Sequence, residues 1–216
     1  QNRGLLGGPH DTEGYREDGG THAEAPHYGL TGPASGAALA TQRYFHLYGA
    51  DTDALAAVCI SLREHAIRNP SAIMRTPLTL EDHRNARAIV EPLKLFDCCL
   101  VNDGAVVVLV TSAERAKDLR STPVYLSGMQ GLRASRDEFI FAPPGLGINQ
   151  QQPGTMRSKA SDQAAYEMAG IARADINGLY TYDAFSPLVL FVLERFGFCA
   201  PGEGAQFVVD GAIGPG

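Results

Sequence analysis

The 216-residue sequence lacks a long hydrophobic run and an excess of basic residues. No apolar run approaches the roughly 20 residues that a membrane-spanning helix needs, so no membrane span is expected. The chain has 18 Lys and Arg against 24 Asp and Glu, a net charge of −6, which argues against a nucleic-acid partner. Hydrophobic residues make up 44% and charged residues 19%, a composition typical of a globular protein with a core.

The sequence also lacks the usual cysteine, histidine and glycine motifs. Its four cysteines show no CxxC spacing, so neither a disulfide framework nor a zinc knuckle is indicated. For Cys98, Cys99 and Cys199, packing is favoured over a nucleophilic or redox role. The six histidines form no HExxH motif and no evident pair with Asp or Cys, and no Walker A or dinucleotide loop occurs. We therefore expect neither a metal nor a cofactor.

The ends of the chain suggest a piece of a longer protein. The sequence starts at Gln1, has its first methionine at Met74 and finishes with "DGAIGPG". Its first residues show no basic segment followed by an apolar one, which a signal peptide would have. Together with the cysteine usage, this favours a cytoplasmic location.

The first half of the chain predicts loop and then helix. Residues 1–27 have the composition of a loop. A helix should begin at Pro33 and stop at Gly49. A second helix should be capped by Asp51 and end before Pro70. Its buried face should be formed by Ala54, Leu55, Val58, Leu62, His65 and Ala66.

The middle of the chain predicts a strand–helix–strand unit after a short helix at 79–85. The apolar, β-branched run 105–110 is typical of a strand covered on both faces. Capping-box spacing at 111–114 then opens a helix to about residue 119, and a further strand follows from 123. This order favours an α/β crossover.

The last third predicts one strongly buried helix. Residues 142–157 read as a loop and about 160–172 as a helix, followed by a short strand within 178–183. Ser186 should then cap a helix with Pro187 in its first position and Gly197 at its end. Its neighbouring positions are almost all apolar, so it should be largely buried.

Tyr182 and Asp183 stand between this strand and this helix. The carboxyl end of a strand is where ligands bind in open α/β sheets, and a helix N-terminus favours an anion or a developing oxyanion. A phenol can donate a hydrogen bond there, or act as a general acid if its pKa is lowered. The alternative, in which Asp183 caps the helix and Tyr182 only packs, stays open at this point.

Several long segments together resemble the thiolase superfamily. They are "RYFHLYGADTDALAAVCISLREHAIRNPSAI", "TLEDHRNARAIVEPLKLFDCCLVNDGAVVVLVTSAERAKDL", "YDAFSPLVLFVLERFGFC" and "GEGAQFVVDGAI". The resemblance runs in consistent order from Tyr28 onward. It is strongest to the sterol-carrier-type thiolases and to the thiolase-like lipid-transfer proteins that act as steroid side-chain aldolases.

The resemblance implies an α/β fold of the thiolase-like, layered αβαβα type, here incomplete and with a helical loop subdomain. It divides the chain into a loop-like segment 1–27, a loop subdomain 28–90, the end of the N-terminal half at 91–122 and the start of the C-terminal half at 123–216. Chains of this superfamily are roughly twice this length, and their remaining catalytic residues would lie outside this chain.

The resemblance also assigns site residues. Tyr182 takes the position whose side chain in thiolases holds the oxyanion-hole water, Asp183 takes a glutamate position, and Phe185 matches a pocket-lining aromatic. His27, Tyr28 and Gly29 resemble a His-Met-Gly segment that faces the acyl-CoA thioester. No cysteine of this chain matches a thiolase catalytic cysteine.

The implied activity is retro-aldol carbon–carbon cleavage of a bulky β-hydroxyacyl-CoA. A phenol can polarise a carbonyl or exchange a proton with an alkoxide, which suits retro-aldol cleavage better than Claisen cleavage by a cysteine. The alternatives are a sterol-carrier-type acetyl-CoA acyltransferase and a non-catalytic lipid-transfer or scaffold subunit. Coenzyme A would enter only as part of the substrate. The implied protein partners are a second copy of the chain and a small OB-fold protein with a zinc ribbon.

Overall fold

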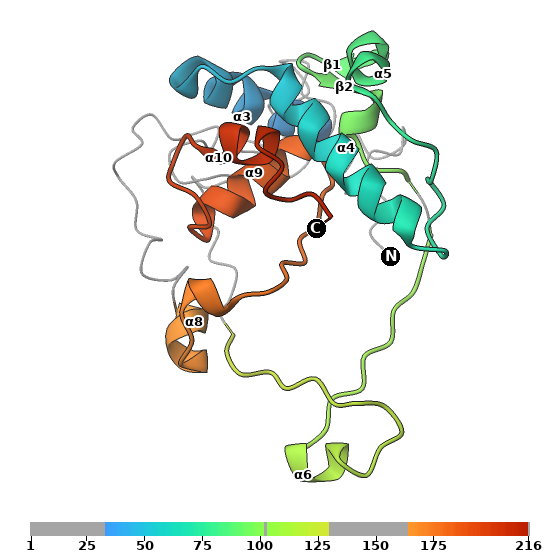
Figure 1. Cartoon of the computed structure of the whole chain (residues 1–216), viewed down its shortest axis with the longest axis vertical. Helices are drawn as coiled ribbons and strands as arrows, with labels where there is room; N and C mark the ends of the chain where they lie inside the picture. The colour runs from blue at the N-terminus through green and yellow to red at the C-terminus, as the bar shows by residue number, and fades with distance from the viewer. Residues whose placement is uncertain (1–32, 102, 130–163, 216) are drawn as a thin grey trace, which may run out of the picture. The chain divides into compact units, whose positions relative to one another are not determined.

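The structure is a computed structural model that describes residues 33–101, 103–129 and 164–215 (Figure 1). These residues fall into two compact units. The first contains 33–99 and 180–215, and the second contains the described parts of 100–129 and 164–179. Among the described helices, none is both long and apolar enough to cross a membrane.

Helix α3 (Pro33–Tyr48) has the predicted bounds. Proline is tolerated in the first turn because its missing N–H would have no helical partner there. Gly49 follows with φ of +71°, a conformation that glycine adopts without a steric penalty. The helix buries a stripe of small residues and the ring of Tyr44, so it packs closely on its neighbours.

Helix α4 (Thr52–Arg68) also begins and ends as predicted. Asp51 caps it by accepting a hydrogen bond from the Asp53 N–H at 2.9 Å, and Asn69 ends it before Pro70. The predicted face is correct in the first three turns, but His65 is exposed. Toward the C-terminal end the face is only partly covered, and the exposed His65 ring bonds the Ile213 carbonyl at 2.9 Å, a limit that periodicity alone does not reveal.

A short helix and a hairpin follow. Helix α5 (Leu80–Asn85) has a capping box between Thr79 and Asp82. Strands β1 (Ala88–Val90) and β2 (Leu93–Lys94) pair antiparallel, with Ala88 opposite Lys94 and Val90 opposite Leu93. The 3-10 helix η3 (Leu95–Asp97) then brings the chain to Asp97, which is buried.

Helix α9 (Ser186–Arg195) lies at the centre of the first unit, and its residues from Ser186 to Glu194 are all buried. The predicted burial is therefore confirmed. The predicted cap is wrong: Phe185 is the N-cap, and Ser186 is already helical. The Ser186 hydroxyl instead bonds a distant carboxylate, a partner that only the tertiary fold supplies. Gly197 ends the last turn with φ of +70°.

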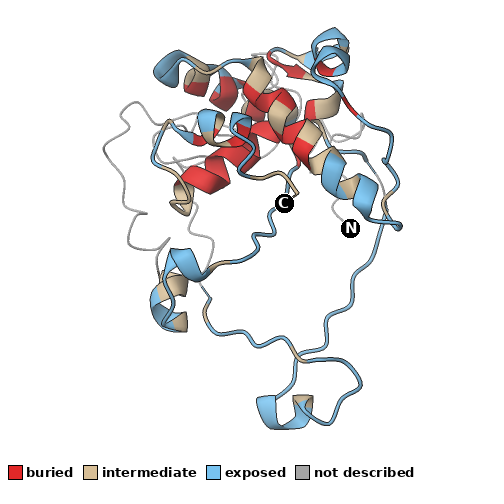
Figure 2. Ribbon diagram, viewed as in Figure 1, coloured by how far each residue is buried: buried red, intermediate tan, exposed pale blue. Residues whose placement is uncertain are grey.

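The core of the first unit forms where α4, α9 and α3 meet helix α10 (Gly204–Val209) (Figures 1 and 2). Figure 2 shows buried residues concentrated on α3, α4 and α9. The rings of Tyr44 and Phe191 lie 5.6 Å apart in a tilted arrangement. The largest fully buried side chains are Tyr44, Phe191, Leu55, Leu93, Leu188 and Leu190.

The described residues of the second unit form three short helical segments, α6 (Ala113–Ala116), α8 (Ala164–Ala169) and η4 (Arg173–Asp175). Ser112 caps α6 through the Arg115 N–H, one residue later than the Thr111 that the predicted capping box implies, and the helix is shorter than predicted. Helix α8 stops three residues before the predicted end because Gly170 has φ of +66°.

The predicted strands at 105–110, from 123, and within 178–183 are wrong, since the described residues there form none. Residues Val106–Val110 are extended, with side chains 76–95% exposed. A strand requires neighbouring backbone to pair with its N–H and C=O groups, and no described segment pairs with this one. The predicted crossover is consequently not formed. Residues 1–27 and 142–157 lie outside the described residues.

Candidate active site

The segment before α9 runs beside the segment after η3. Phe185 and Cys98 form an antiparallel β-bridge, and the Cys99 N–H donates to the Ala184 carbonyl at 3.0 Å. Because α9 is anchored in the core, its N-terminal approach is held at one place. The predicted site residues Tyr182, Asp183 and Phe185 all belong to this approach.

Tyr182 lies at the exposed end of this pairing. Its side chain is 55% exposed, and its hydroxyl lies 3.9 Å from the Cys99 Sγ. This contact, more than burial or the Asp183 charge, raises the pKa of the Tyr182 phenol. The phenol is therefore protonated at neutral pH and available as a hydrogen-bond donor. The lowered pKa that would favour rapid proton release is not found.

The other predicted residues take different places. Asp183 is exposed and three residues before Ser186, so the interpretation of Asp183 as the helix cap is wrong. Phe185 is the N-cap and packs partly against the core. His27, Tyr28 and Gly29 lie outside the described residues.

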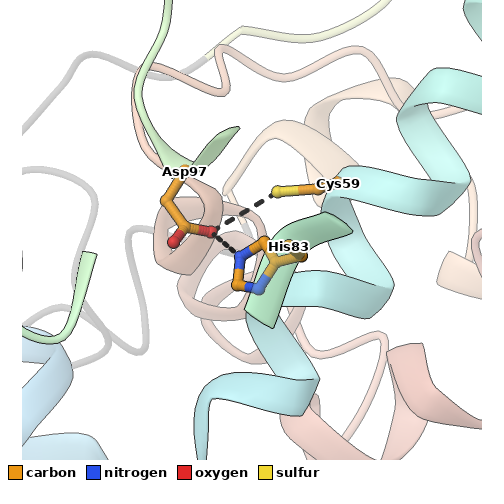
Figure 3. Close-up of side chains that lie close together, drawn as sticks. All are labelled: Cys59, His83 and Asp97. Atoms are coloured by element: carbon orange, nitrogen blue, oxygen red, sulfur yellow. Dashed lines mark hydrogen bonds and ion pairs between the residues drawn. The ribbon is translucent and has the colours of Figure 1, made fainter. Parts of the chain in front are cut away.

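A buried polar cluster adjoins the first residue of α9, and Figure 3 shows three of its members, Cys59, His83 and Asp97. We call it the Asp97 cluster; it consists of Cys59, His83, Asp97 and Ser186. The Asp97 Oδ1 accepts from the His83 Nε2 at 2.9 Å, the Ser186 hydroxyl at 2.9 Å and the Cys59 thiol at 3.4 Å. Its Oδ2 accepts from the Lys94 N–H at 2.8 Å. One carboxylate thus joins α4, α5, η3 and α9.

The charge state of the Asp97 cluster follows from these contacts. Burial alone would raise the pKa of Asp97, but hydrogen bonds from His83, Lys94 and Ser186 outweigh burial and hold that pKa below its usual range. Burial and the neighbouring Asp97 raise the pKa of the Cys59 thiol. The cluster is thus an ionised carboxylate surrounded by donors, one of them a neutral thiol.

The sequence-based expectation that no histidine pairs with Asp or Cys is wrong for His83. The ligand atoms of Cys59, His83 and Asp97 lie within 4.8 Å of one another, and these residue types bind zinc. However, the Asp97 Oδ1 itself stands where the other groups converge. In addition, the His83 Nδ1 is buried and has no hydrogen-bond partner among the described residues, whereas a ligating histidine usually anchors its second nitrogen. The geometry is that of a hydrogen-bonded carboxylate.

Sequence reasoning missed this cluster because its members are far apart along the chain. Asp97 is 14 residues from His83 and 89 from Ser186. No spacing rule covers such separations. Two signals were available: an aspartate inside the mostly apolar stretch 93–100, and a serine at the start of an apolar helix. Each has an explanation within its own segment, the aspartate as a turn residue and the serine as a helix cap.

A second buried carboxylate, Glu194, joins α3, α9 and α10. The Tyr44 hydroxyl donates to its Oε1 at 2.5 Å, and the Gly204 N–H donates to the same oxygen at 2.9 Å. The Tyr44 oxygen in turn accepts from the Ala205 N–H at 3.2 Å. Burial raises the pKa of Glu194 although these bonds act to lower it. This group stabilises the fold rather than the exposed segment at Tyr182.

Comparison with known proteins bears on the class of this fold. Residues 147–216 match the family described as thiolase C-terminal domain-like. Among solved structures, an Ltp2–ChsH2(DUF35) aldolase chain superposes with a TM-score of 0.74 at 35% identity, over 90% of this chain and 51% of that one. The chain is thiolase-like, and the predicted incomplete thiolase-like fold is confirmed.

Its relatives identify the branch. It is 39% identical over 193 residues to a 17-hydroxy-3-oxo-4-pregnene-20-carboxyl-CoA lyase of Mycobacterium tuberculosis, covering 87% of this chain and 48% of the relative. It is 39% identical over 188 residues to a steroid side-chain-cleaving aldolase of Thermomonospora curvata, covering 86% and 47%. The predicted resemblance to steroid side-chain aldolases is confirmed, and the chain spans about half the length of these relatives.

Proposed function

We propose that the complete protein carrying this chain is a carbon–carbon lyase that cleaves a bulky, steroid-like β-hydroxyacyl-CoA by a retro-aldol reaction. The observation that carries the proposal is the protonated, exposed phenol of Tyr182, held in front of a buried helix in a chain 39% identical to two steroid side-chain lyases.

The proposed reaction is redox-neutral. A base removes the proton of the β-hydroxyl, the Cα–Cβ bond breaks, and its electron pair becomes the enolate of the CoA thioester. A ketone leaves, and protonation of the enolate at Cα gives the shortened acyl-CoA. The largest contribution to such catalysis is a preorganised donor aimed at the oxygen where charge develops. We assign this role to Tyr182, whose raised pKa keeps it a donor throughout.

The remaining site assignments are part of the same proposal. Phe185 and the His27, Tyr28 and Gly29 segment would contact the acyl-CoA, and Asp183 would assist Tyr182 near the reacting carbonyl. The name of the solved structure pairs an aldolase with a DUF35 protein. This supports a DUF35-type partner subunit for the present protein. We propose in addition that this partner is the expected OB-fold protein with a zinc ribbon and that the chain forms a homodimer.

The test is Tyr182→Phe in the complete protein with its partner subunit, assayed by release of the ketone. Loss of one oxyanion donor should lower kcat by about 10²–10³-fold and leave KM nearly unchanged, since the ring remains. Tyr180→Phe is the matched control, because that tyrosine lies two residues away with its side chain in solvent. Equal turnover of wild type and Tyr182→Phe would exclude the assigned role.

A second candidate is an acyltransferase that uses Cys99, which matches no thiolase catalytic cysteine but has an exposed thiol beside Tyr182. An acyltransferase requires a thiolate that takes up the acyl group. Cys99→Ser separates the two candidates, because it should abolish CoA-dependent acyl transfer but leave ketone release intact. Substrate binding without turnover in both assays would instead identify a scaffold subunit.

A further inference from the structure

We infer that Asp97 and Ser186 are positioning residues for Tyr182. Their hydrogen bond is the buried end of a row of contacts that joins the segment 97–99 to the segment 182–186. The exposed end of this row places the Tyr182 hydroxyl beside Cys99. The inference rests on the proposed function in one respect, because Tyr182, the side chain that is positioned, is the catalytic residue of the proposed lyase.

The contacts follow one another in strict order along the two segments. The Ser186 hydroxyl donates to the Asp97 Oδ1 at 2.9 Å. The next pair outward is the bridge of Phe185 with Cys98. Beyond it, the Cys99 N–H donates to the Ala184 carbonyl at 3.0 Å, and the last contact is that of Tyr182 with Cys99 at 3.9 Å.

The two ends of this row differ in burial. Asp97 and Ser186 are buried, whereas Cys99 and Tyr182 are exposed; between them, Cys98 and Phe185 are half-buried and Ala184 is buried. Contacts at the exposed end compete with water and are individually weak. The placement of Tyr182 therefore depends on the buried end, where solvent cannot replace the lost partner.

The buried end is well suited to this task because both of its members are fixed independently. The Lys94 N–H and His83 hold the Asp97 carboxylate from the side of η3 and α5, as Figure 3 shows for His83. Ser186 is the first residue of α9, which is buried along its length. The bond between them thus joins two parts of the core at the inner end of the segment that carries Tyr182, whose Ala184 and Phe185 also contact the core.

The test uses Ser186→Ala in the complete protein with its partner subunit, and Thr41→Val as the matched control. Thr41 is also buried, but its hydroxyl bonds only the Ala37 carbonyl of its own helix. Three quantities are measured for each variant: the unfolding midpoint, kcat and KM for ketone release, and the rate at which iodoacetamide alkylates Cys99, followed by peptide mass spectrometry.

We expect both variants to lower the unfolding midpoint, but only Ser186→Ala to change the site. Because misplacement of a reacting group by about 1 Å can cost 10²-fold in rate, Ser186→Ala should lower kcat about tenfold with KM changed less than twofold. Cys99 should be alkylated several-fold faster as its pairing with the Tyr182 segment loosens. Ser186→Thr, which keeps the hydroxyl, should restore both values toward wild type.

Wild-type kcat and wild-type Cys99 alkylation in Ser186→Ala would overturn the inference, whatever the loss of stability. Asp97→Asn is the second variant and should reproduce the effect of Ser186→Ala; if it does not fold, Ser186→Ala decides alone. Cys99 alkylation also separates the two proposals. If Tyr182→Phe retains full turnover, the proposed role of Tyr182 fails, while the alkylation rates still confirm or refute the positioning role of Asp97 and Ser186.

Discussion

Removing one hydroxyl from the core, by Tyr44→Phe, should reveal how strongly the buried Glu194 depends on its partners. The substitution keeps the ring that packs 5.6 Å from Phe191 and removes a donor that lies 2.5 Å from the Glu194 Oε1. It also removes the acceptor of the Ala205 N–H. The change is therefore almost purely electrostatic.

The expected magnitude follows from these two bonds. A hydrogen bond to a charged group contributes about 1.5–3 kcal/mol, and a neutral one about 1 kcal/mol. Since the Ala205 N–H is only partly buried, water can replace much of its bond. We expect Tyr44→Phe to lower the free energy of unfolding by about 2–3 kcal/mol at pH 8, measured by urea denaturation.

The loss should depend on pH with a definite sign. The pKa of Glu194 is already raised by burial, so its ionisation is penalised in the folded state and stability falls as pH rises through the folded-state pKa. The Tyr44 bond lowers that pKa, and its removal raises it further. The difference between wild type and Tyr44→Phe should therefore be larger at pH 8 than at pH 5.

Two controls isolate this effect. In a Glu194→Gln background the carboxyl charge is absent, so Tyr44→Phe should cost only about 1 kcal/mol at either pH. Tyr48→Phe removes the hydroxyl of a neighbouring ring that is partly exposed and should change stability by less than about 0.5 kcal/mol. A loss that is the same at pH 5 and pH 8 in the wild-type background would refute the reasoning.

Two further predictions concern the backbone and the surface. Gly202→Ala would place a Cβ 2.4 Å from the Tyr48 ring at a φ of +88°, whereas Gly49→Ala at φ +71° meets nothing within 4 Å. Urea denaturation should therefore show that Gly49→Ala lowers the free energy of unfolding by about 1 kcal/mol and that Gly202→Ala lowers it clearly more. Equal losses for the two variants would contradict this prediction. The double substitution Val107→Lys with Leu109→Lys removes apolar surface from an exposed run. It should reduce binding of a hydrophobic dye by the chain produced alone, and unchanged binding would show that this run is covered.

Local chemistry made the helices predictable. Pro33, Asp51 and Gly197 each act within one turn of their own helix, through a fixed φ, a side-chain cap or a left-handed conformation. The apolar composition of residues 186–195 likewise requires that this helix be buried, wherever it lies in the fold. The resemblance to thiolases rests on the same kind of linear information and needed no coordinates.

Pairing across the chain was not predictable in this way. The run at 105–110 has the composition of a strand, but strand formation requires a partner, and no described segment pairs with it. Ser186 resembled a helix cap because its local context is that of a cap. It instead donates to Asp97, 89 residues earlier, because the core brings the two together.

The sequence by itself thus determined the bounds of α3 and α4, the burial of α9, and the place of Tyr182 before α9. The tertiary structure alone decided that a buried carboxylate faces Ser186, that Cys99 lies beside Tyr182, and that the pKa of the Tyr182 phenol is raised by this contact. The physical reason is the distance along the chain over which each interaction acts. Caps and periodicity act over a few residues, whereas the burial and hydrogen bonds that set pKa values and place a catalytic side chain come from segments that meet only in the folded chain.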